Sequence, residues 1–373
     1  MKKIAIIGAS YLQLPAVLKA KELGFEVHCF AWEDGAVCAS YVDFFYPISI
    51  LERDKILECC QRIPIDGIVT LASDIAVLTV NYVANKMRLV SNSDAYSLLT
   101  TNKYLMRECF TKNLLPSPKY MLVNQSQEYD IDGFKFPVIV KPTDRSGSRG
   151  VEKVLNISDL PTAINRAVSL SFSKEAIIEE FIDGREVSVE AISFQGRHYI
   201  LAVTDKVTTG EPYFVELEHH QPSSLALDII ERIKEIVFQA LSSLHIEYGA
   251  SHTELKISDD EQNIKIIEVG ARMGGDFIGS DLVCLSTGYD FLKAAILVAM
   301  GIFEEPVVSK HDFSGVYFLS QETLFLKSVI ENKNKFPQIV KAEIIDENIR
   351  PIACSGDRSG YLIYKSNKRF FVK

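Results

Sequence analysis

The stretch VIVKPTDRSGSRGVEKV, residues 138–154, ends an apolar run with Lys141 and continues in a loop rich in Gly, Ser and Arg. Such a loop is typical of a phosphate-binding site, because main-chain N–H groups and hydroxyls bind phosphate oxygens. The P-loop motif has its lysine after the glycines and a helix behind it. Here the lysine comes first, and the residues after Gly150 read as another strand. The sequence therefore predicts a strand-borne lysine facing a flexible loop, 143–150, across a phosphate.

The composition is ordinary for a globular protein, with 47% hydrophobic and 24% charged residues over 373 positions. A formal net charge of −9 argues against a nucleic-acid or anionic-membrane surface, although a local basic pocket remains compatible with it. No run of about 18 apolar residues exists that could span a membrane. The seven cysteines show no C-x-x-C spacing, which favours free thiols. We therefore expect a cytoplasmic protein without nucleic-acid or membrane partners.

The first 90 residues read as a small α/β domain. An apolar run ends at Gly8, an amphipathic segment covers 12–23, and a second apolar run, FEVHCFA, follows. This β-turn-α-β order predicts a doubly wound parallel sheet. The turn GASYLQ lacks the G-x-G-x-x-G fingerprint and the acidic residue that should follow it, so an NAD-dependent oxidoreductase is disfavoured.

The remaining chain is predicted to be α+β. The pattern indicates helices and hairpins, with the clearest amphipathic helix at 224–244. We place a core at 91–300, divided into 91–178 and 179–300, and a C-terminal α+β extension at 301–373. The predicted elements are strands from about 119, a helix at 158–170, hairpins at 185–207 and 250–269, and a helix at 289–301.

Paired carboxylates mark the second hairpin. If its turn is centred near Glu261, Glu254 lies opposite Glu268, and directly opposed side chains share one face of the sheet. Mg²⁺ relieves the repulsion of such a pair, because it binds one or two carboxylates together with phosphate oxygens. The alternative is two solvated glutamates on an exposed hairpin. Arg272 and two glycines downstream favour a site, since guanidinium groups recognise phosphate and carboxylate bidentately.

Together and in this order, the motifs resemble the ATP-grasp superfamily over nearly the whole chain. In that family a nucleotide lies between two α+β subdomains, and a lysine-bearing strand precedes a Gly-rich loop. The order of domains is most similar to the carboxylate–amine ligase branch, which includes the bacterial L-amino-acid ligases and has a biotin-carboxylase-like architecture. The resemblance implies a preATP-grasp domain at 1–90, an ATP-grasp core and a small C-terminal extension.

The resemblance also implies roles for the matched residues. Lys103 and Lys141 look like the phosphate-contacting lysines, Lys141 and Arg272 like the catalytic cations, and Glu254 and Glu268 like the metal ligands. The nucleotide positions are the loop residues Ser146, Gly147, Ser148 and Gly150, the adenine hinge Glu179, Glu180 and Ile182, and the ribose residue Glu186. The sequence departs from the family pattern at Gly270, where many members have a metal-ligating asparagine. The resemblance therefore leaves open how a second magnesium would be held.

Substrate contacts are less visible in the sequence. The candidates lie in a region that faces the site in relatives or next to the predicted metal ligands: Lys206, His219, His220, His252, Arg272, Gly274 and Gly275. His219 and His220 are adjacent, so a strand sends them to opposite faces, which disfavours a histidine-based metal site. A lone histidine is more often structural than substrate-binding, and both interpretations stay open here.

The resemblance implies an ADP-forming ligase that uses ATP and Mg²⁺, with Mn²⁺ as an alternative. It would join a small-molecule carboxylate to an amine through an acyl phosphate, and relatives suggest a homodimer. The alternatives are a carboxylase or carbamoyl-phosphate-type enzyme and a non-catalytic ATP-binding module. The absence of a biotin-carrier lysine motif and of a glutaminase segment disfavours the former, and the full set of charged residues disfavours the latter.

Overall fold

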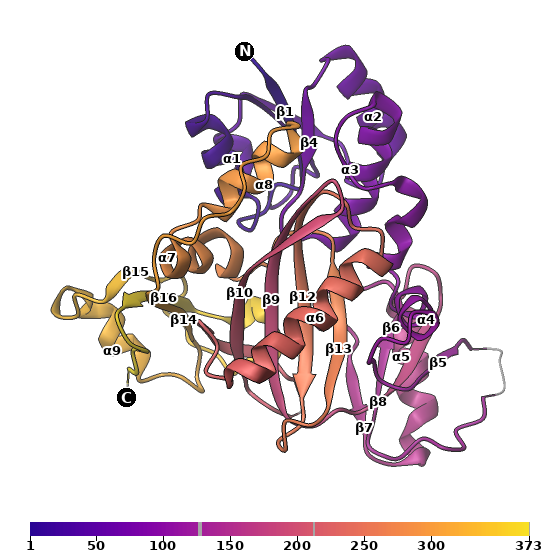
Figure 1. Cartoon of the computed structure of the whole chain (residues 1–373). Helices are drawn as coiled ribbons and strands as arrows, with labels where there is room; N and C mark the ends of the chain where they lie inside the picture. Colours follow the sequence, from indigo (N-terminus) through magenta and orange to yellow (C-terminus); the bar gives the residue numbers. More distant parts are fainter. Residues whose placement is uncertain (126–128, 212, 373) are drawn as a thin grey trace.

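The computed structural model describes residues 1–125, 129–211 and 213–372, and its strands form three sheets (Figure 1). The first 90 residues form an α/β unit, as predicted. Its elements are β1 (Lys3–Ile7), α1 (Leu14–Glu22), β2 (Glu26–Ala31), β3 (Phe44–Pro47), α2 (Arg53–Arg62), β4 (Gly67–Val69) and α3 (Asp74–Met87). The sheet has the order β3-β2-β1-β4 and all its pairs are parallel, so the doubly wound sheet is confirmed.

Helices cover both faces of this parallel sheet. Along β1, Ile4 and Ile6 pack toward α1, whereas Ala5 and Ile7 pack toward α2 and α3, as the two-residue period of a strand requires. The first face is completed by α8 (Phe291–Ala299), which comes from the far end of the predicted core and lies beside α1 (Figure 1). The N-terminal unit is therefore packed against a late segment of the chain.

A small antiparallel sheet carries the lysine strand. It has the order β5-β8-β6-β7 and is covered by α5. Its strands and the helices around it are α4 (Lys103–Lys112), β5 (Tyr120–Val123), β6 (Val138–Pro142), β7 (Glu152–Val154), α5 (Leu160–Leu170) and β8 (Ala176–Glu180). Lys141 lies on β6 and the Gly-rich loop leads into β7, which confirms the predicted strand–loop–strand order.

The large sheet is antiparallel and has the order β13-β12-β9-β10-β11-β14-β16-β15. Its first part contains β9 (Arg185–Phe194), β10 (Arg197–Thr208), β11 (Glu216–Gln221), α6 (Leu227–Ser243), β12 (Gly249–Ile257) and β13 (Ile264–Gly270). The segment REVSVEAISF of β9 sends Val187 and Val189 toward α6, which lies across this face (Figure 1). Its alternating polar residues, Glu186 and Glu190, therefore point to the opposite face.

The last 70 residues continue the large sheet. They supply β14 (Phe313–Leu319), α9 (Leu326–Glu331), β15 (Ile339–Ile344) and β16 (Gly360–Ser366), after the short helix α7 (Val283–Thr287). Because β14 pairs with β11, hydrogen bonding runs across the boundary that we placed at residue 300, and the domain limits stay a prediction. Among the described residues no helix has the length and apolar character needed to cross a membrane.

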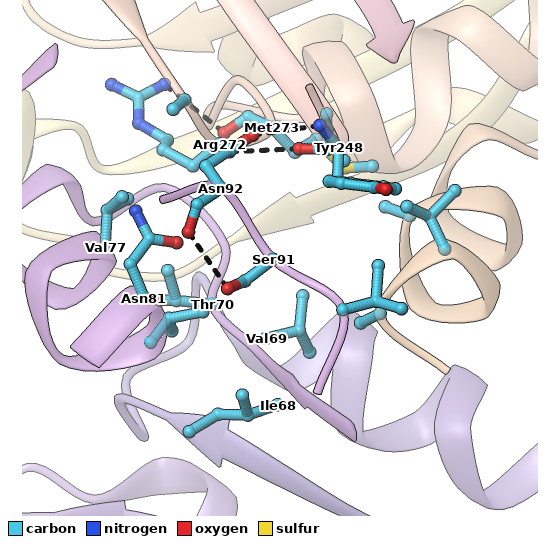
Figure 2. Close-up of a pocket in the computed structure, with 18 of the residues that line it drawn as sticks. Ile68, Val69, Thr70, Val77, Asn81, Ser91, Asn92, Tyr248, Arg272 and Met273 are labelled. Carbon is cyan, nitrogen blue, oxygen red and sulfur yellow. Dashed lines mark hydrogen bonds between the residues drawn. The ribbon is translucent and has the colours of Figure 1, made fainter. Parts of the chain in front are cut away.

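A polar contact joins the segment after α3 to the start of β12. Figure 2 shows Asn92 beside Tyr248, next to a cavity of about 60 Å³ that is lined by apolar side chains of β4 and α3. The Asn92 amide donates to the carbonyl of Tyr248 (3.0 Å) and accepts from the N–H groups of Glu247 (2.7 Å) and Tyr248 (2.9 Å). These three bonds satisfy main-chain groups at the entry to β12.

We expect Asn92→Ala to lower the free energy of unfolding by about 1–2 kcal/mol, because it leaves three partly buried main-chain groups without their side-chain partner. Urea unfolding of the whole chain measures this change. Asn156→Ala, at an exposed asparagine, is the matched control and should have little effect. Equal losses for the two variants would contradict the proposed importance of the contact.

Candidate active site

A cavity of about 210 Å³ lies between the small sheet and the polar face of the large sheet. Strands β6 and β8 and the Gly-rich loop form one wall, and β12 and β13 form the other. Most predicted residues line it: Lys103, Lys141, Ser146, Gly147, Ser148, Glu179, Glu180, Ile182, Glu186, His252, Glu254, Glu268 and Arg272. The predicted residues outside its lining are Gly150, Lys206, His219, His220, Gly274 and Gly275.

Two buried lysines approach the cavity from different elements. Lys103 begins α4, where Asn102 caps the helix by accepting from the Leu105 N–H, and its Nζ donates to Glu268 (2.8 Å). Burial works against the charge of Lys103, but Glu268 and nearby carboxylates outweigh it and raise the pKa of this lysine. For Lys141 burial dominates and lowers the pKa, since Glu179 offsets it only in part. An anionic ligand beside Lys141 would therefore stabilise its charged form.

The Gly-rich loop adopts a conformation that favours glycine. Gly147 and Gly150 have φ values of 67° and 77°, and Ser148 between them has 55°. Ser146, Gly147 and Ser148 line the cavity. Gly150 lies at the base of the loop, where an added Cβ would be 2.8 Å from Leu170, so its place in the structure is explained by packing.

Glu254 and Glu268 are directly opposed in the register of β12 and β13, as predicted. Each is paired with a lysine: Lys206 lies 2.6 Å from Glu254, and Lys103 lies 2.8 Å from Glu268. No group of three or more His, Cys, Asp or Glu side chains within the described ranges could hold a metal. The two carboxylates fit a Mg²⁺ whose remaining ligands come from phosphate oxygens and water.

Lys206 lies beneath the cavity among three carboxylates. Its Nζ is 2.9 Å from Glu186, 3.4 Å from Glu216 and 2.6 Å from Glu254. Burial opposes its charge, but these carboxylates prevail and raise its pKa well above the ordinary value. Lys206, which we predicted to contact substrate, thus holds three carboxylates together, and Glu186 and Glu216 also contact Lys256 and Arg358.

His252 and Gly274 meet beside the opposed pair Glu254 and Glu268. His252 Nδ1 forms a short contact with the buried carboxylate of Glu190, which also accepts from the Gly274 N–H (3.2 Å). Burial would lower the pKa of His252, but Glu190 reverses this and raises it to about 9. A Cβ at Gly274 would lie 2.7 Å from His252, so this glycine permits the close approach; Gly275 instead lies against Ala72 of the N-terminal unit.

His219 and His220 point to opposite faces, as expected from their adjacency. His219 is paired in register with Lys206 and so shares its face, and neither ring nitrogen has a hydrogen-bond partner among the described residues. Burial and nearby cations hold the pKa of His219 well below its usual range. His220 contacts Glu218 and Tyr364 on the other face, away from the cavity.

Arg107 is an important residue that we missed. This guanidinium is fully buried on α4, donates to the carbonyl of Ile267 (2.6 Å), and lies 2.9 Å from Glu179 without the alignment of a hydrogen bond. Glu179 also contacts Lys141 (2.7 Å), and the two cations outweigh burial to keep its pKa low. Its position could have been predicted from its spacing, because Arg107 follows Lys103 by four residues and therefore lies on the same face of the helix.

The other missed residues come from distant parts of the chain. Phe181 and Phe214 line an apolar end of the cavity, with ring centroids 6.3 Å apart. Arg358, from the loop before β16, is 2.9 Å from Glu216 and 2.7 Å from Asp276. Asp74, at the first turn of α3, also lines the cavity. Nothing in the local sequence around these residues places them together.

We expect Glu179→Gln to lower the free energy of unfolding by about 3–5 kcal/mol, because it leaves Arg107 and Lys141 buried without a carboxylate. Urea denaturation is the measurement. The next residue offers a matched control: Glu180 is exposed at the end of the same strand, and Glu180→Gln should change stability by about 0.5 kcal/mol or less. A similar small effect of both substitutions would show that the buried pairs contribute little.

Two antiparallel sheets thus enclose a cavity lined by two lysines, an arginine and a pair of opposed carboxylates, groups that can hold an anion and a cation. In comparison with known proteins, residues 134–281 match the family model of the ATP-grasp domain. The L-amino acid ligase structure from Bacillus licheniformis superposes with a TM-score of 0.82 at 23% identity, covering 99% of this chain and 94% of that one. Residues 134–281 are therefore similar to the ATP-grasp domain, and nearly the whole chain shares the fold of that ligase structure.

Curated relatives match shorter segments. The D-alanine–D-alanine ligase of Flavobacterium johnsoniae is 30% identical over 131 residues, which are 34% of this chain and 40% of that protein. The alanine–anticapsin ligase of Bacillus subtilis is 27% identical over 198 residues, 47% of this chain and 41% of that protein. The matches thus span about two fifths of each of these relatives.

Proposed function

We propose that the chain is an ATP-dependent ligase that joins a carboxylate to an amine through an acyl phosphate and releases ADP and phosphate. The observation that carries the proposal is the convergence of Lys103, Lys141, Arg272 and the opposed pair Glu254 and Glu268 on one cavity. These residues supply the charges that phosphoryl transfer needs, because that reaction depends on positioning and on neutralising negative charge.

The cavity suggests one orientation for the nucleotide. Its apolar end, with Phe181, Ile182 and Phe214, fits an adenine ring, and Glu186 is available for the ribose hydroxyls. The opposite end carries the lysines and the loop residues Ser146–Ser148, which fit the phosphates. In this orientation the transferred phosphoryl group lies near the end of β13.

The proposed reaction has two displacements. A carboxylate oxygen attacks the γ-phosphorus and the bond to ADP breaks; the amine nitrogen then attacks the acyl carbon, phosphate leaves, and the amine loses a proton. Lys103 and Lys141 would hold the phosphates and neutralise the charge that develops on them. A Mg²⁺ bound by Glu254 and Glu268 would add further neutralisation. Arg272 would stabilise the acyl phosphate or the following oxyanion.

Relatives support the choice of carboxylate–amine chemistry. The names of the three proteins compared above describe ligases of alanine or other amino acids. We extend this activity to the present chain because its cavity contains the charged residues described above. The proposal does not depend on any cysteine nucleophile, since the acyl phosphate is formed directly from ATP.

The main experiment incubates the protein with ATP, Mg²⁺ and pools of amino acids and measures phosphate release. We expect release that depends on a particular carboxylate–amine pair. Glu268→Gln should lower this rate about 100-fold or more, because it removes a charge that holds the metal. Glu235→Gln, at an exposed position on α6, is the control and should retain the rate.

Other outcomes of this screen would contradict the proposal. Release that depends on bicarbonate without an added organic acid would identify a carboxylase or carbamoyl-phosphate-type enzyme. Nucleotide binding without release in any pool, including pools of other organic acids, would favour the non-catalytic module. Mass spectrometry of the products distinguishes an amide from uncoupled ATP hydrolysis.

The adenine position can be tested separately. We expect Phe214→Ala to weaken ADP binding about tenfold, since stacking of a base on an aromatic ring contributes about 1–3 kcal/mol. Isothermal titration calorimetry with ADP and Mg²⁺ gives the dissociation constants. Phe238→Ala, on α6 at the opposite face of the large sheet, should bind ADP like the unaltered protein. Unchanged binding by Phe214→Ala would place the base elsewhere.

A further inference from the structure

Arg272 is held by a residue of the N-terminal unit. Its Nε lies 2.8 Å and its Nη2 3.1 Å from the two oxygens of Asp74, at the start of α3. Its Nη1 donates to the carbonyl of Met273 (3.2 Å). In Figure 2 the Arg272 side chain extends away from the apolar cavity around Val69. A guanidinium has five N–H donors, so two remain for a ligand in the active-site cavity.

The glycine at position 270 is explained by packing and not by its backbone conformation. It lies at the end of β13, and its φ is not in the left-handed region, so its backbone conformation is open to other residues. An added Cβ would be 2.7 Å from Oδ1 of Asp74 and 3.2 Å from the guanidinium of Arg272. The space beside position 270 is thus filled by the carboxylate of a residue from another unit.

The tight fit cannot be relieved by a simple movement of Asp74. Its side chain is short and buried, and both oxygens are engaged by Arg272. The guanidinium in turn is fixed by the Met273 carbonyl. A side chain at position 270 would therefore have to break the bidentate pair or shift α3.

We propose that Asp74 occupies the place of the side chain that position 270 lacks, and that it is a positioning residue which fixes Arg272 for catalysis. The active site would then be complete only with the N-terminal unit in place. The role of Arg272 rests on the proposed ligase function, whereas the exclusion of side chains at position 270 depends only on the structure. The two parts can therefore be tested independently.

The first experiment needs no substrate. Gly270→Asn is made in the unaltered chain and in an Asp74→Ala background, and urea midpoints are compared as a double-mutant cycle. We expect a clear loss in the unaltered chain and a much smaller loss in the Asp74→Ala background. Gly356→Asn is the control, because a Cβ there would have its nearest neighbour at 3.6 Å. Equal losses in both backgrounds, or no loss, would overturn the proposal.

If Gly270→Asn does not fold, Gly270→Ala serves in the same cycle, because the conflict already begins at the Cβ. Its loss should again be smaller in the Asp74→Ala background. An equal loss in the two backgrounds would again overturn the steric part.

The second experiment tests positioning. With a carboxylate–amine pair identified in the screen, we expect Asp74→Asn to lower kcat about 100-fold, the effect of misplacing a reacting group by about 1 Å. Its dissociation constant for ADP and Mg²⁺ should stay unchanged, because Asp74 does not hold the nucleotide. A retained kcat, or an equal change in ADP binding, would overturn the positioning role. A wild-type chain without turnover would contradict the ligase function, and the stability cycle would still decide the steric part.

Discussion

The compensation of buried charge is the constraint on which this structure depends. A charged side chain in a protein interior is stable only when an opposite charge lies beside it, because an unpaired buried ion costs several kcal/mol. Glu179 contacts two cations, Arg107 and Lys141. Lys206 contacts three carboxylates, and two of these, Glu186 and Glu216, are shared with Lys256 and Arg358. The buried charges at the cavity are therefore compensated through shared partners rather than in isolated pairs.

The folding pattern accounts for how these charges meet. The two-residue period of β9, β10 and β12 places valine and leucine against α6 and places glutamate and lysine on the opposite face. One irregularity matters, because the bulge at Val207 and Thr208 brings Glu216 onto the face of Lys206. Hydrophobic packing on the apolar face stabilises the sheet. The polar face can therefore carry charged side chains in place of hydrophobic ones. The site thus depends on the hydrophobic packing behind it.

Much of this arrangement could be predicted from the sequence because its determinants are local. The lysine strand, the Gly-rich loop and the opposed pair Glu254 and Glu268 each follow from periodicity and from the position of a turn. The divergence of His219 and His220 follows from the same period. The contributions of Phe214 and Arg358 could not be predicted, since Arg358 lies 142 residues beyond its partner Glu216. Only the register of β11 and β14 brings that part of the chain to the site.

Gly270 shows why a departure from a family pattern cannot be interpreted from one position alone. In the sequence, Gly270 stands where many family members have a metal-ligating asparagine, and it leaves open how a second magnesium is held. In the structure the same space contains the carboxylate of Asp74, whose partner Arg272 is 198 positions away. Burial would raise the pKa of Asp74, but Arg272 and Lys103 outweigh it and keep the group ionised. Gly270 has no side chain of its own, but a carboxylate lies beside it, and this carboxylate belongs to the N-terminal unit. A change at the interface between this unit and the core would for this reason affect the position of Arg272 as well as stability.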